Sequence, residues 1–258
     1  MEYEALEVRQ RDNTVVIALN RPEVMNALNA QMRREITYAV RKAPESGRAL
    51  VITGSGKAFC SGQDLGDRVD ASNVNLERTL REEYFPMLEA IKDCPIPIIG
   101  AVNGPAAGAG ANLALAADVV IAAESAYFMQ AFSRIGLIPD AGGTWLLPRK
   151  IGLARSIGAS LFAEKISARQ AADWGMIWES VVDENFEEHW QRRAMQLAQG
   201  PTEAYMRIKK ALGASFSNGY EEQLELEARL QGEAGKSRDF QEGVLAFVEK
   251  RRPVFEGR

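Results

Sequence analysis

Apolar runs that predict buried strands recur along the first 200 residues and alternate with amphipathic segments that predict helices. The predicted strands cover residues 3–8, 14–19, 49–54, 96–102, 118–123, 126–129 and 179–183. Helices are predicted at 29–41, 76–93, 113–117, 153–161, 167–174, 184–198, 202–215, 219–232 and 236–250. The pattern predicts an α/β core over residues 1–200 and a helical appendage over residues 201–258.

A glycine-rich loop at residues 103–112 (NGPAAGAGAN) separates the apolar strand at 96–102 from the next predicted helix. Such a loop lets a ligand lie directly against the backbone, because almost no side chain intervenes. The helix points unpaired N–H groups and the positive end of its dipole at that ligand, which suits a phosphate or an oxygen that becomes negative during a reaction. The alternative is a tight strand–helix turn in which glycine serves packing.

Another glycine-rich loop, residues 55–65 (SGKAFCSGQDL), follows the strand at 49–54. Backbone N–H groups near Gly62 and Gln63 would supply the other half of an oxyanion hole, which needs two donors. The alternative is an ordinary turn in which Asp64 caps the segment that follows.

A third loop, within residues 131–145 (AFSRIGLIPDAGGTW), presents Asp140 beside Pro139, Gly142 and Gly143. Burial of a carboxylate in this apolar setting would raise its pKa and suit it to general acid–base work. The alternative is that Asp140 caps the helix that follows.

Composition narrows the function classes. With 46% apolar and 26% charged residues, the chain is typical of a soluble domain. Its net charge of −4 and pI near 5.4 argue against nucleic-acid binding. No apolar run reaches membrane-spanning length and no signal segment opens the chain, so we expect a cytoplasmic protein that does not bind membranes.

The isolated Cys60 and Cys94 match neither a disulfide framework nor a metal site. The single histidine, His189, lies on a polar predicted helix, where we expect it on the surface. A Ser-His-Asp triad and a histidine-based zinc site are therefore not expected. Acid–base chemistry must then use a carboxylate, Lys, Tyr or Cys.

Several spaced motifs together resemble the enoyl-CoA hydratase/isomerase (crotonase) superfamily. They are residues 20–22 (NRP) with 26–28 (NAL), 59–65 (FCSGQDL), 101–104 (AVNG) with 108–110 (GAG), and 136–139 (GLIP) with 142–144 (GGT). The resemblance runs from about residue 3 to 255. It implies a spiral of ββα units in two near-perpendicular sheets, a helical C-terminal region that forms trimers or dimers of trimers, and an acyl-CoA thioester substrate. It implies no metal or redox cofactor, since coenzyme A is part of the substrate.

The resemblance also assigns roles to particular residues. The thioester oxygen would accept hydrogen bonds from the N–H groups of Gln63 and Ala109. The expected CoA contacts are Val24, Asn26, Ser61, Gly62, Asp64, Leu65 and Gly108, and Phe247 and Lys250 would reach the CoA of a neighbouring subunit.

Two departures from the superfamily pattern bear on the reaction. Where the hydratases of the superfamily carry their two glutamates, this chain has Asn112 and Phe132. Adding water to an enoyl thioester ordinarily uses both carboxylates, so hydration is not expected. The remaining carboxylate, Asp140, beside an oxyanion hole suits moving a proton within a bound thioester. Phe128, Phe132 and Trp145 would supply an apolar wall for a cyclic or aromatic acyl group, with core packing as the alternative for all three.

Residues 106–114 and 130–145 are most similar to those of the isomerases of phenylacetate degradation, which convert ring-1,2-epoxyphenylacetyl-CoA to oxepin-CoA. The function implied is therefore an acyl-CoA isomerase with Asp140 as acid and base. The alternatives are a Δ3 to Δ2 enoyl-CoA isomerase of fatty acid metabolism and, less favoured, an enoyl-CoA hydratase. An aryl- or acyl-CoA hydrolase or dehalogenase with Asp140 as nucleophile and a non-catalytic binding protein also stay open.

Overall fold

The structure, a computed structural model, describes residues 3–66 and 75–258. Over these residues the main sheet has six strands in the order β1-β2-β3-β4-β6-β9. They are β1 (Leu6–Arg11), β2 (Thr14–Leu19), β3 (Ala49–Gly54), β4 (Ile98–Val102), β6 (Val119–Ala123) and β9 (Glu179–Val181). Apart from the antiparallel pair β1 and β2, neighbouring strands are parallel. The loops that follow β3 and β4 therefore leave the same edge of the sheet.

A smaller sheet joins three short strands, with β5 parallel to β7 and β8 antiparallel to β7. These strands are β5 (Ala106–Ala107), β7 (Tyr127–Met129) and β8 (Ile166–Ser167). An isolated bridge pairs Cys60, in the loop after β3, with Ala106. The loops after β3 and β4 are therefore held against each other by backbone pairing.

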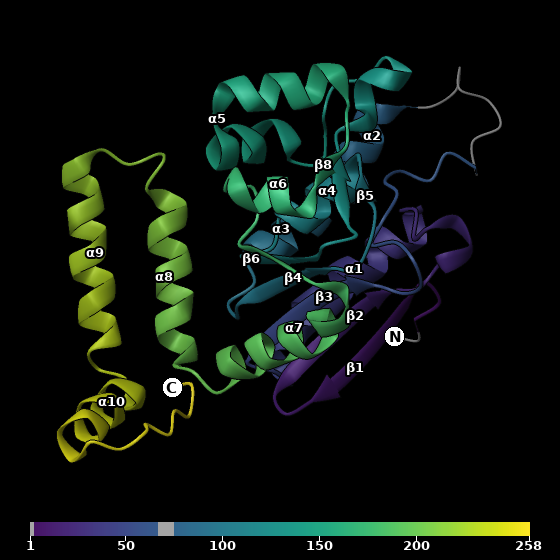
Figure 1. The fold of residues 1–258 in the computed structure, drawn as a ribbon. Helices are drawn as coiled ribbons and strands as arrows, with labels where there is room; N and C mark the ends of the chain where they lie inside the picture. The colour runs from purple at the N-terminus through teal and green to yellow at the C-terminus, as the bar shows by residue number, and fades with distance from the viewer. Residues whose placement is uncertain (1–2, 67–74) are drawn as a thin grey trace.

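Helices pack around both sheets (Figure 1). They are α1 (Ala30–Lys42), α2 (Leu76–Thr79), α3 (Phe85–Lys92), α4 (Ala109–Leu115), α5 (Gly143–Phe162), α6 (Ala168–Asp173) and α7 (Asp183–Ala198), with the π-helix η4 (Leu80–Tyr84) and the 3₁₀ turns η1 (Pro22–Val24), η2 (Ala43–Glu45) and η5 (Ala131–Ile135). α7 packs on β2, β3, β4, β6 and β9, and α1 packs on β1, β2 and α3. β4 is buried at every position, which requires cover on both faces of the sheet.

α1 begins where the sequence places its cap. The Oδ1 of Asn29 accepts a hydrogen bond of 2.8 Å from the N–H of Met32, which satisfies one of the free donors of the first turn. Met32, Ile36 and Val40 repeat at helical spacing and are buried against the sheet and α3. Arg33 is buried beside them, so a charge lies inside this face of the helix.

Beyond residue 200 the chain forms a helical arm of α8 (Thr202–Ala214), α9 (Tyr220–Ala234) and α10 (Arg238–Glu249), which stands away from the sheets (Figure 1). The predicted boundary lies between α7 and α8. α8 and α9 run side by side. Lys209 of α8 donates to the carbonyl oxygens of Cys94 and Ile96 at 2.8 and 3.0 Å and pairs with Asp118 at 2.7 Å, which fastens the arm to the core.

The strands and helices predicted from the sequence are confirmed in kind and order, but the short strands β5 and β8 were not predicted, and α4 begins at Ala109 instead of residue 113. Three further corrections concern the first strand and two helices. The first strand is β1 rather than residues 3–8, because a hairpin turn at Asp12 and Asn13, both with positive φ, lets pairing with β2 continue to Arg11. The helix predicted at 76–93 contains a π-helical turn, η4. The helix predicted at 153–161 belongs to α5, which has non-helical backbone at Gly152.

His189 is less exposed than predicted. Its ring lies partly buried on α7, where Nε2 is 2.8 Å from Oε1 of Glu179. Among the helices that the structure describes, none is long and apolar enough to cross a membrane.

Candidate active site

The first of the three loops in chain order, residues 55–65 after β3, presents the N–H of Gln63. Leu28 pairs with Gln63 in an isolated parallel bridge, in which the N–H of Leu28 donates to Gly62 at 2.7 Å and the N–H of Asp64 donates to Leu28 at 3.1 Å. In a parallel bridge of this kind the N–H of the central residue points away from its partner. The N–H of Gln63 therefore faces the side of the loop after β4.

The second loop in chain order, residues 103–112 after β4, presents the N–H of Ala109. Gly108 has φ 52° and ψ −127°, a backbone conformation open to glycine, and Ala109 is the first residue of α4. A Cβ on Gly62 would lie 2.8 Å from the oxygen of Ala107 and 3.4 Å from the nitrogen of Ala109, so only glycine allows this approach. Over residues 3–66 and 75–258, neither Gln63 N–H nor Ala109 N–H donates to a protein acceptor. Two free donors thus lie close together.

The third loop is attached to the second through a buried amide. Nδ2 of Asn112, on α4, donates to the backbone oxygen of Asp140 at 2.8 Å, and Oδ1 of Asn112 accepts from Nε2 of Gln130 at 2.9 Å. Both amides are completely buried. A Cβ on Gly143 would lie 2.3 Å from Nδ2 of Asn112, so glycine is needed for this contact. Asp140 is therefore held by the same helix that begins with the Ala109 donor.

The Asp140 carboxyl lies in an environment that favours its protonated form. Its Oδ1 is buried and, among the described residues, has no hydrogen-bond partner. Burial raises the pKa of Asp140 to about 6, and the positive charge of Arg33 opposes part of that rise. The alternative that Asp140 caps α5 is wrong, since the cap is Gly142 and no side chain bonds there. At neutral pH this carboxylate can accept a proton and return it.

Three residues were predicted to form an acyl wall. Phe128, on β7, is completely buried in the hydrophobic core, whereas Phe132 and Trp145 lie in different surroundings. Phe132 is buried, and a Cβ on Gly108 would lie 3.8 Å from its Cζ, which places the ring beside the second loop. Trp145 is 49% exposed, and the guanidinium of Arg149 lies 4.1 Å from its ring centre. A wall role remains a prediction for both, and Phe132 is the better placed.

The residues predicted to contact CoA divide into exposed and buried ones. Val24, at the end of η1, and Leu65, at the end of the first loop, are both exposed. The Oγ of Ser61, which is partly exposed, donates to the oxygen of Val24 at 3.2 Å. Gly62 and Gly108 provide the close backbone approach described above. For these residues CoA contact stays a prediction.

Two of the predicted CoA contacts are used within the protein. Asn26 is completely buried, and its side chain bonds to Arg21, Ser55 and Ala58 backbone groups, each at 2.9 Å. Both polar atoms of the Asn26 side chain are thus bonded within the protein, and CoA contact at Asn26 stays a prediction. Asp64 is nearly buried and pairs with Arg21 at 2.6 Å, so it braces the first loop.

Phe247 and Lys250 lie on α10 and just after it, in the arm. Phe247 is 85% exposed, and Lys250 is exposed with φ 55°. Within residues 3–66 and 75–258, no hydrogen bond or ion pair joins Phe247 or Lys250 to the three loops. Their predicted role on a neighbouring subunit stays a prediction.

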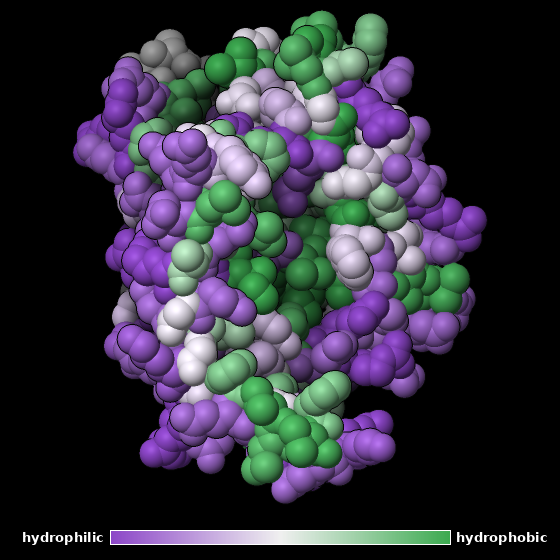
Figure 2. All heavy atoms as spheres, turned by 90° about the vertical axis from the view of Figure 1, so that its left-hand side faces the viewer, coloured by the Kyte–Doolittle hydropathy of each residue, from purple (hydrophilic) through white to green (hydrophobic). Residues whose placement is uncertain are grey.

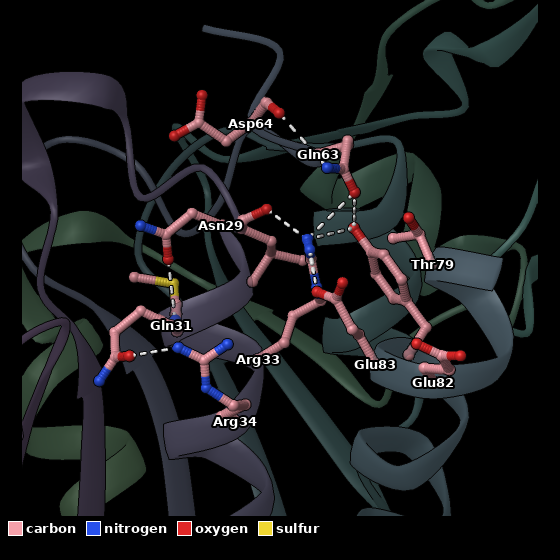
Figure 3. A network of polar contacts seen from close by, with 12 residues as sticks. Asn29, Gln31, Arg33, Arg34, Gln63, Asp64, Thr79, Glu82 and Glu83 are labelled. Carbon is pink, nitrogen blue, oxygen red and sulfur yellow. Dashed lines mark hydrogen bonds and ion pairs between the residues drawn. The ribbon is translucent and has the colours of Figure 1, made fainter. Parts of the chain in front are cut away.

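The polar residues that hydrogen-bond to Gln63 and Asn112 and hold their side chains in place were not predicted from the sequence. Arg33 and Tyr84 bond to the side chain of Gln63, and Glu83 pairs with Arg33 (Figure 3). Gln130 donates to Asn112. One signal was available: Arg33 occupies the apolar face of α1 at helical spacing from Ile36. A charge on a face that is otherwise buried requires a partner.

The three loops bring together two free backbone N–H donors and one carboxylate, which are the groups needed to stabilise a carbonyl oxygen that becomes negative while a proton moves. The family model for enoyl-CoA hydratase/isomerase matches residues 9–258. The chain belongs to this family, and the predicted membership of the crotonase superfamily, whose enzymes act on CoA thioesters, is confirmed.

Relatives and solved structures agree with the family. The chain is 62% identical over 258 residues to a protein of Rhodobacter capsulatus named probable enoyl-CoA hydratase, covering 100% of both chains. It is 45% identical over 249 residues to 1,2-epoxyphenylacetyl-CoA isomerase of Escherichia coli, covering 95% of both. A crystal structure of an enoyl-CoA hydratase/isomerase from Mycobacterium abscessus superimposes with a TM-score of 0.93 at 37% identity, covering 98% of this chain and 100% of the other. The crotonase fold predicted from the sequence is confirmed.

Proposed function

We propose that the protein is an isomerase of acyl-CoA thioesters in which Asp140 moves a proton and the N–H groups of Gln63 and Ala109 hold the thioester oxygen. The observation that carries this proposal is the single Asp140 carboxylate, whose pKa is raised to about 6 by burial and whose loop is tied to α4 by Asn112. At neutral pH most of this carboxylate is ionised and can act as a base. Its conjugate acid is still strong enough to return the proton.

For a β,γ-enoyl thioester, the ionised Asp140 takes a proton from Cα. The electron pair left behind delocalises onto the thioester oxygen, where two N–H donors stabilise the negative charge. Protonated Asp140 then delivers the same proton to Cγ, and the double bond moves into conjugation. Atoms and charge balance without water or a cofactor.

The raised pKa gives a direct expectation for the pH dependence. Since the ionised form of Asp140 starts the reaction, kcat/KM should fall as pH drops through about 6 and should level off above about 7. Initial rates between pH 4.5 and 8.5 measure this. A profile with no inflection between pH 5 and 7 would contradict the assignment of Asp140 as the base.

The favoured acyl group is ring-1,2-epoxyphenylacetyl-CoA, converted to oxepin-CoA in phenylacetate degradation. The relative at 45% identity that carries this name supports it. A linear β,γ-enoyl-CoA of fatty acid metabolism is the alternative substrate, because the same proton transfer serves both. Comparing kcat/KM for the two substrates distinguishes these interpretations. A value for the epoxide more than about 10 times that for the linear enoyl-CoA, equivalent to about 1.4 kcal/mol, supports the ring isomerase. The reverse ratio supports an isomerase of linear enoyl-CoA.

Hydration is the second candidate, because the relative at 62% identity is named probable enoyl-CoA hydratase. Water addition would need a second acid–base group beside Asp140. Asn112 has an amide whose two ends are already bonded to Asp140 and Gln130, and Phe132 has no polar group. The thiol of Cys60 cannot replace them, because burial raises its pKa to about 12. Isomerisation is therefore favoured over hydration.

We further propose that the protein assembles in the cytoplasm as a homotrimer or a dimer of trimers through its helical arm. A hollow lined with apolar residues opens on the face that carries the arm (Figure 2). Exposed apolar side chains of the arm are Leu212, Phe216, Leu224, Val244, Phe247 and Val248. Exposed apolar surface of this kind favours association. Sedimentation should give three or six times the chain mass of 28.4 kDa, and a monomer would contradict the proposal.

A further inference from the structure

Arg33 is a buried cation behind the candidate oxyanion hole. Its side chain is 1% exposed and its guanidinium forms an ion pair with Glu83. Nη1 donates to the backbone oxygen of Leu28 at 2.6 Å, to Oε1 of Gln63 at 3.1 Å and to the hydroxyl of Tyr84 at 3.4 Å. Nε donates to Glu83 at 3.0 Å. A buried charge is tolerated only with such complete pairing.

The same group fixes the side chain of Gln63 (Figure 3). Besides the bond from Arg33, Oε1 of Gln63 accepts from the hydroxyl of Tyr84 at 2.6 Å. Burial raises the pKa of Tyr84, so its hydroxyl stays protonated and can donate. Arg33 also lies 4.7 Å from the centre of the Tyr84 ring. With its side chain clamped from two sides, Gln63 has little freedom to turn its backbone N–H away from the site.

Arg33 is not placed to bind a ligand itself. All three of its nitrogens already donate to protein oxygens, and solvent hardly reaches it. A phosphate or carboxylate of a substrate would have to displace one of these bonds. Its effect on the reaction must therefore pass through Gln63 and through its charge.

The charge of Arg33 acts on Asp140 from the α1 side. On η4, Tyr84 interacts electrostatically with Asp140 and is a neutral hydroxyl, and the neighbouring Glu83 is bound to Arg33. On the α4 and β7 sides the neighbours are the amides of Asn112 and Gln130, which carry no charge. The electrostatic environment of Asp140 thus depends on how far Glu83 neutralises Arg33.

We propose that Arg33 is a positioning residue of this site, which clamps the oxyanion donor Gln63 and whose buried positive charge acts on Asp140. The inference deepens the proposed isomerase function and rests on it for the effect on turnover. The effect of the Arg33 charge on the titration of Asp140 can be measured without turnover.

Two variants should move the titration of Asp140 in opposite directions. Arg33→Met removes the positive charge and should raise the midpoint by on the order of one pH unit. Glu83→Gln leaves Arg33 charged but no longer neutralised, and should lower the midpoint. The ¹³C carboxyl shift of Asp140, assigned with Asp140→Asn, reports the midpoint in the free protein. A merely structural role would move both midpoints alike or not at all.

Turnover tests the clamp. Tyr84→Phe removes the hydroxyl that donates to Gln63 and leaves the charge of Arg33 in place. We expect kcat for the β,γ-enoyl-CoA to fall about tenfold with KM changed less than threefold, as for loss of a bond that matters in the transition state. Arg33→Lys keeps the positive charge, so the midpoint of the Asp140 titration should stay within a few tenths of a pH unit. The loss of kcat should be similar to that of Tyr84→Phe, because lysine lacks the planar guanidinium that donates to several acceptors at once.

The outcomes separate this inference from the proposed function. Unmoved midpoints in Arg33→Met and Glu83→Gln, or a loss confined to KM in Tyr84→Phe, overturn the role of Arg33 even in an active isomerase. Midpoints that move as expected in a protein without isomerase activity overturn the proposed function and leave the charge effect established. If Arg33→Met does not fold, Glu83→Gln decides alone, and an unchanged or raised midpoint contradicts the inference.

Discussion

Asp140→Asn is expected to lower kcat for isomerisation by about 10²–10⁴-fold, the usual contribution of a positioned acid–base group. The amide has nearly the same shape but cannot take a proton from Cα. The hydrogen bond from Asn112 to residue 140 involves the backbone oxygen and is retained. The KM, and the dissociation constant for a saturated acyl-CoA, should therefore change little. Steady-state rates and calorimetric titration measure both.

Stability provides the control for this variant. The pKa of Asp140 is about 6 in the folded protein, above the value of about 3.9 for an unfolded aspartate. Ionising it therefore costs folding free energy, and the cost appears as pH rises from about 4 through 6. Asp140→Asn should raise the free energy of unfolding by about 1 kcal/mol at pH 7, after discounting for solvent screening, and by almost nothing at pH 4. A stability loss at pH 7 would contradict this account of the site.

Ala109→Pro is expected to lower kcat by about 10²–10³-fold, because it deletes one donor of the oxyanion hole. Ala109 is the first residue of α4, a position where proline fits the helix and where the N–H has no helical partner. The substitution therefore removes the N–H at a place that tolerates proline. Rates with a β,γ-enoyl-CoA measure the loss, and thermal unfolding reports the state of the fold.

Ala109→Gly is the matched control, because it also changes the residue but keeps the N–H. It should retain kcat within a few-fold and cost up to about 1 kcal/mol of stability from lower helix propensity. Equal losses of kcat in the two variants would show that the shape of the loop matters and that the Ala109 N–H is not a donor to the substrate.

Periodicity in the sequence was enough to predict the elements that carry the site. The strand predicted at 96–102 corresponds to β4, and the glycine-rich loop after it leads into α4. A short apolar run that ends at glycine residues is typical of a buried strand followed by a turn. Strand ends in a parallel sheet meet at one edge, which also explains why the first loop lies beside the second. Errors fell at turns such as Asp12 and Asn13, where positive φ on non-glycine residues has a weak signal.

The polar bracing of the site could not be read from the sequence. Asn112 was predicted only as a position where a hydratase glutamate is missing, yet it bonds to Asp140, 28 residues away. Arg33 and Glu83 are 50 residues apart. Such pairs depend on how separate elements pack, and periodicity within one element carries no information about them. For the same reason the burial of Asn26 among three backbone partners was not foreseen.

The central claim is that Asp140 moves a proton within a CoA thioester and that no water is added. It is tested most directly by mixing the protein with a β,γ-enoyl-CoA in deuterated water and analysing the product by NMR and mass spectrometry. We predict the conjugated α,β-enoyl-CoA, formed by the native protein and not by Asp140→Asn, with part of the hydrogen retained at Cγ because a half-buried carboxyl exchanges slowly with solvent. A 3-hydroxyacyl-CoA as the main product, or equal rates in the Asp140→Asn variant, would contradict the claim.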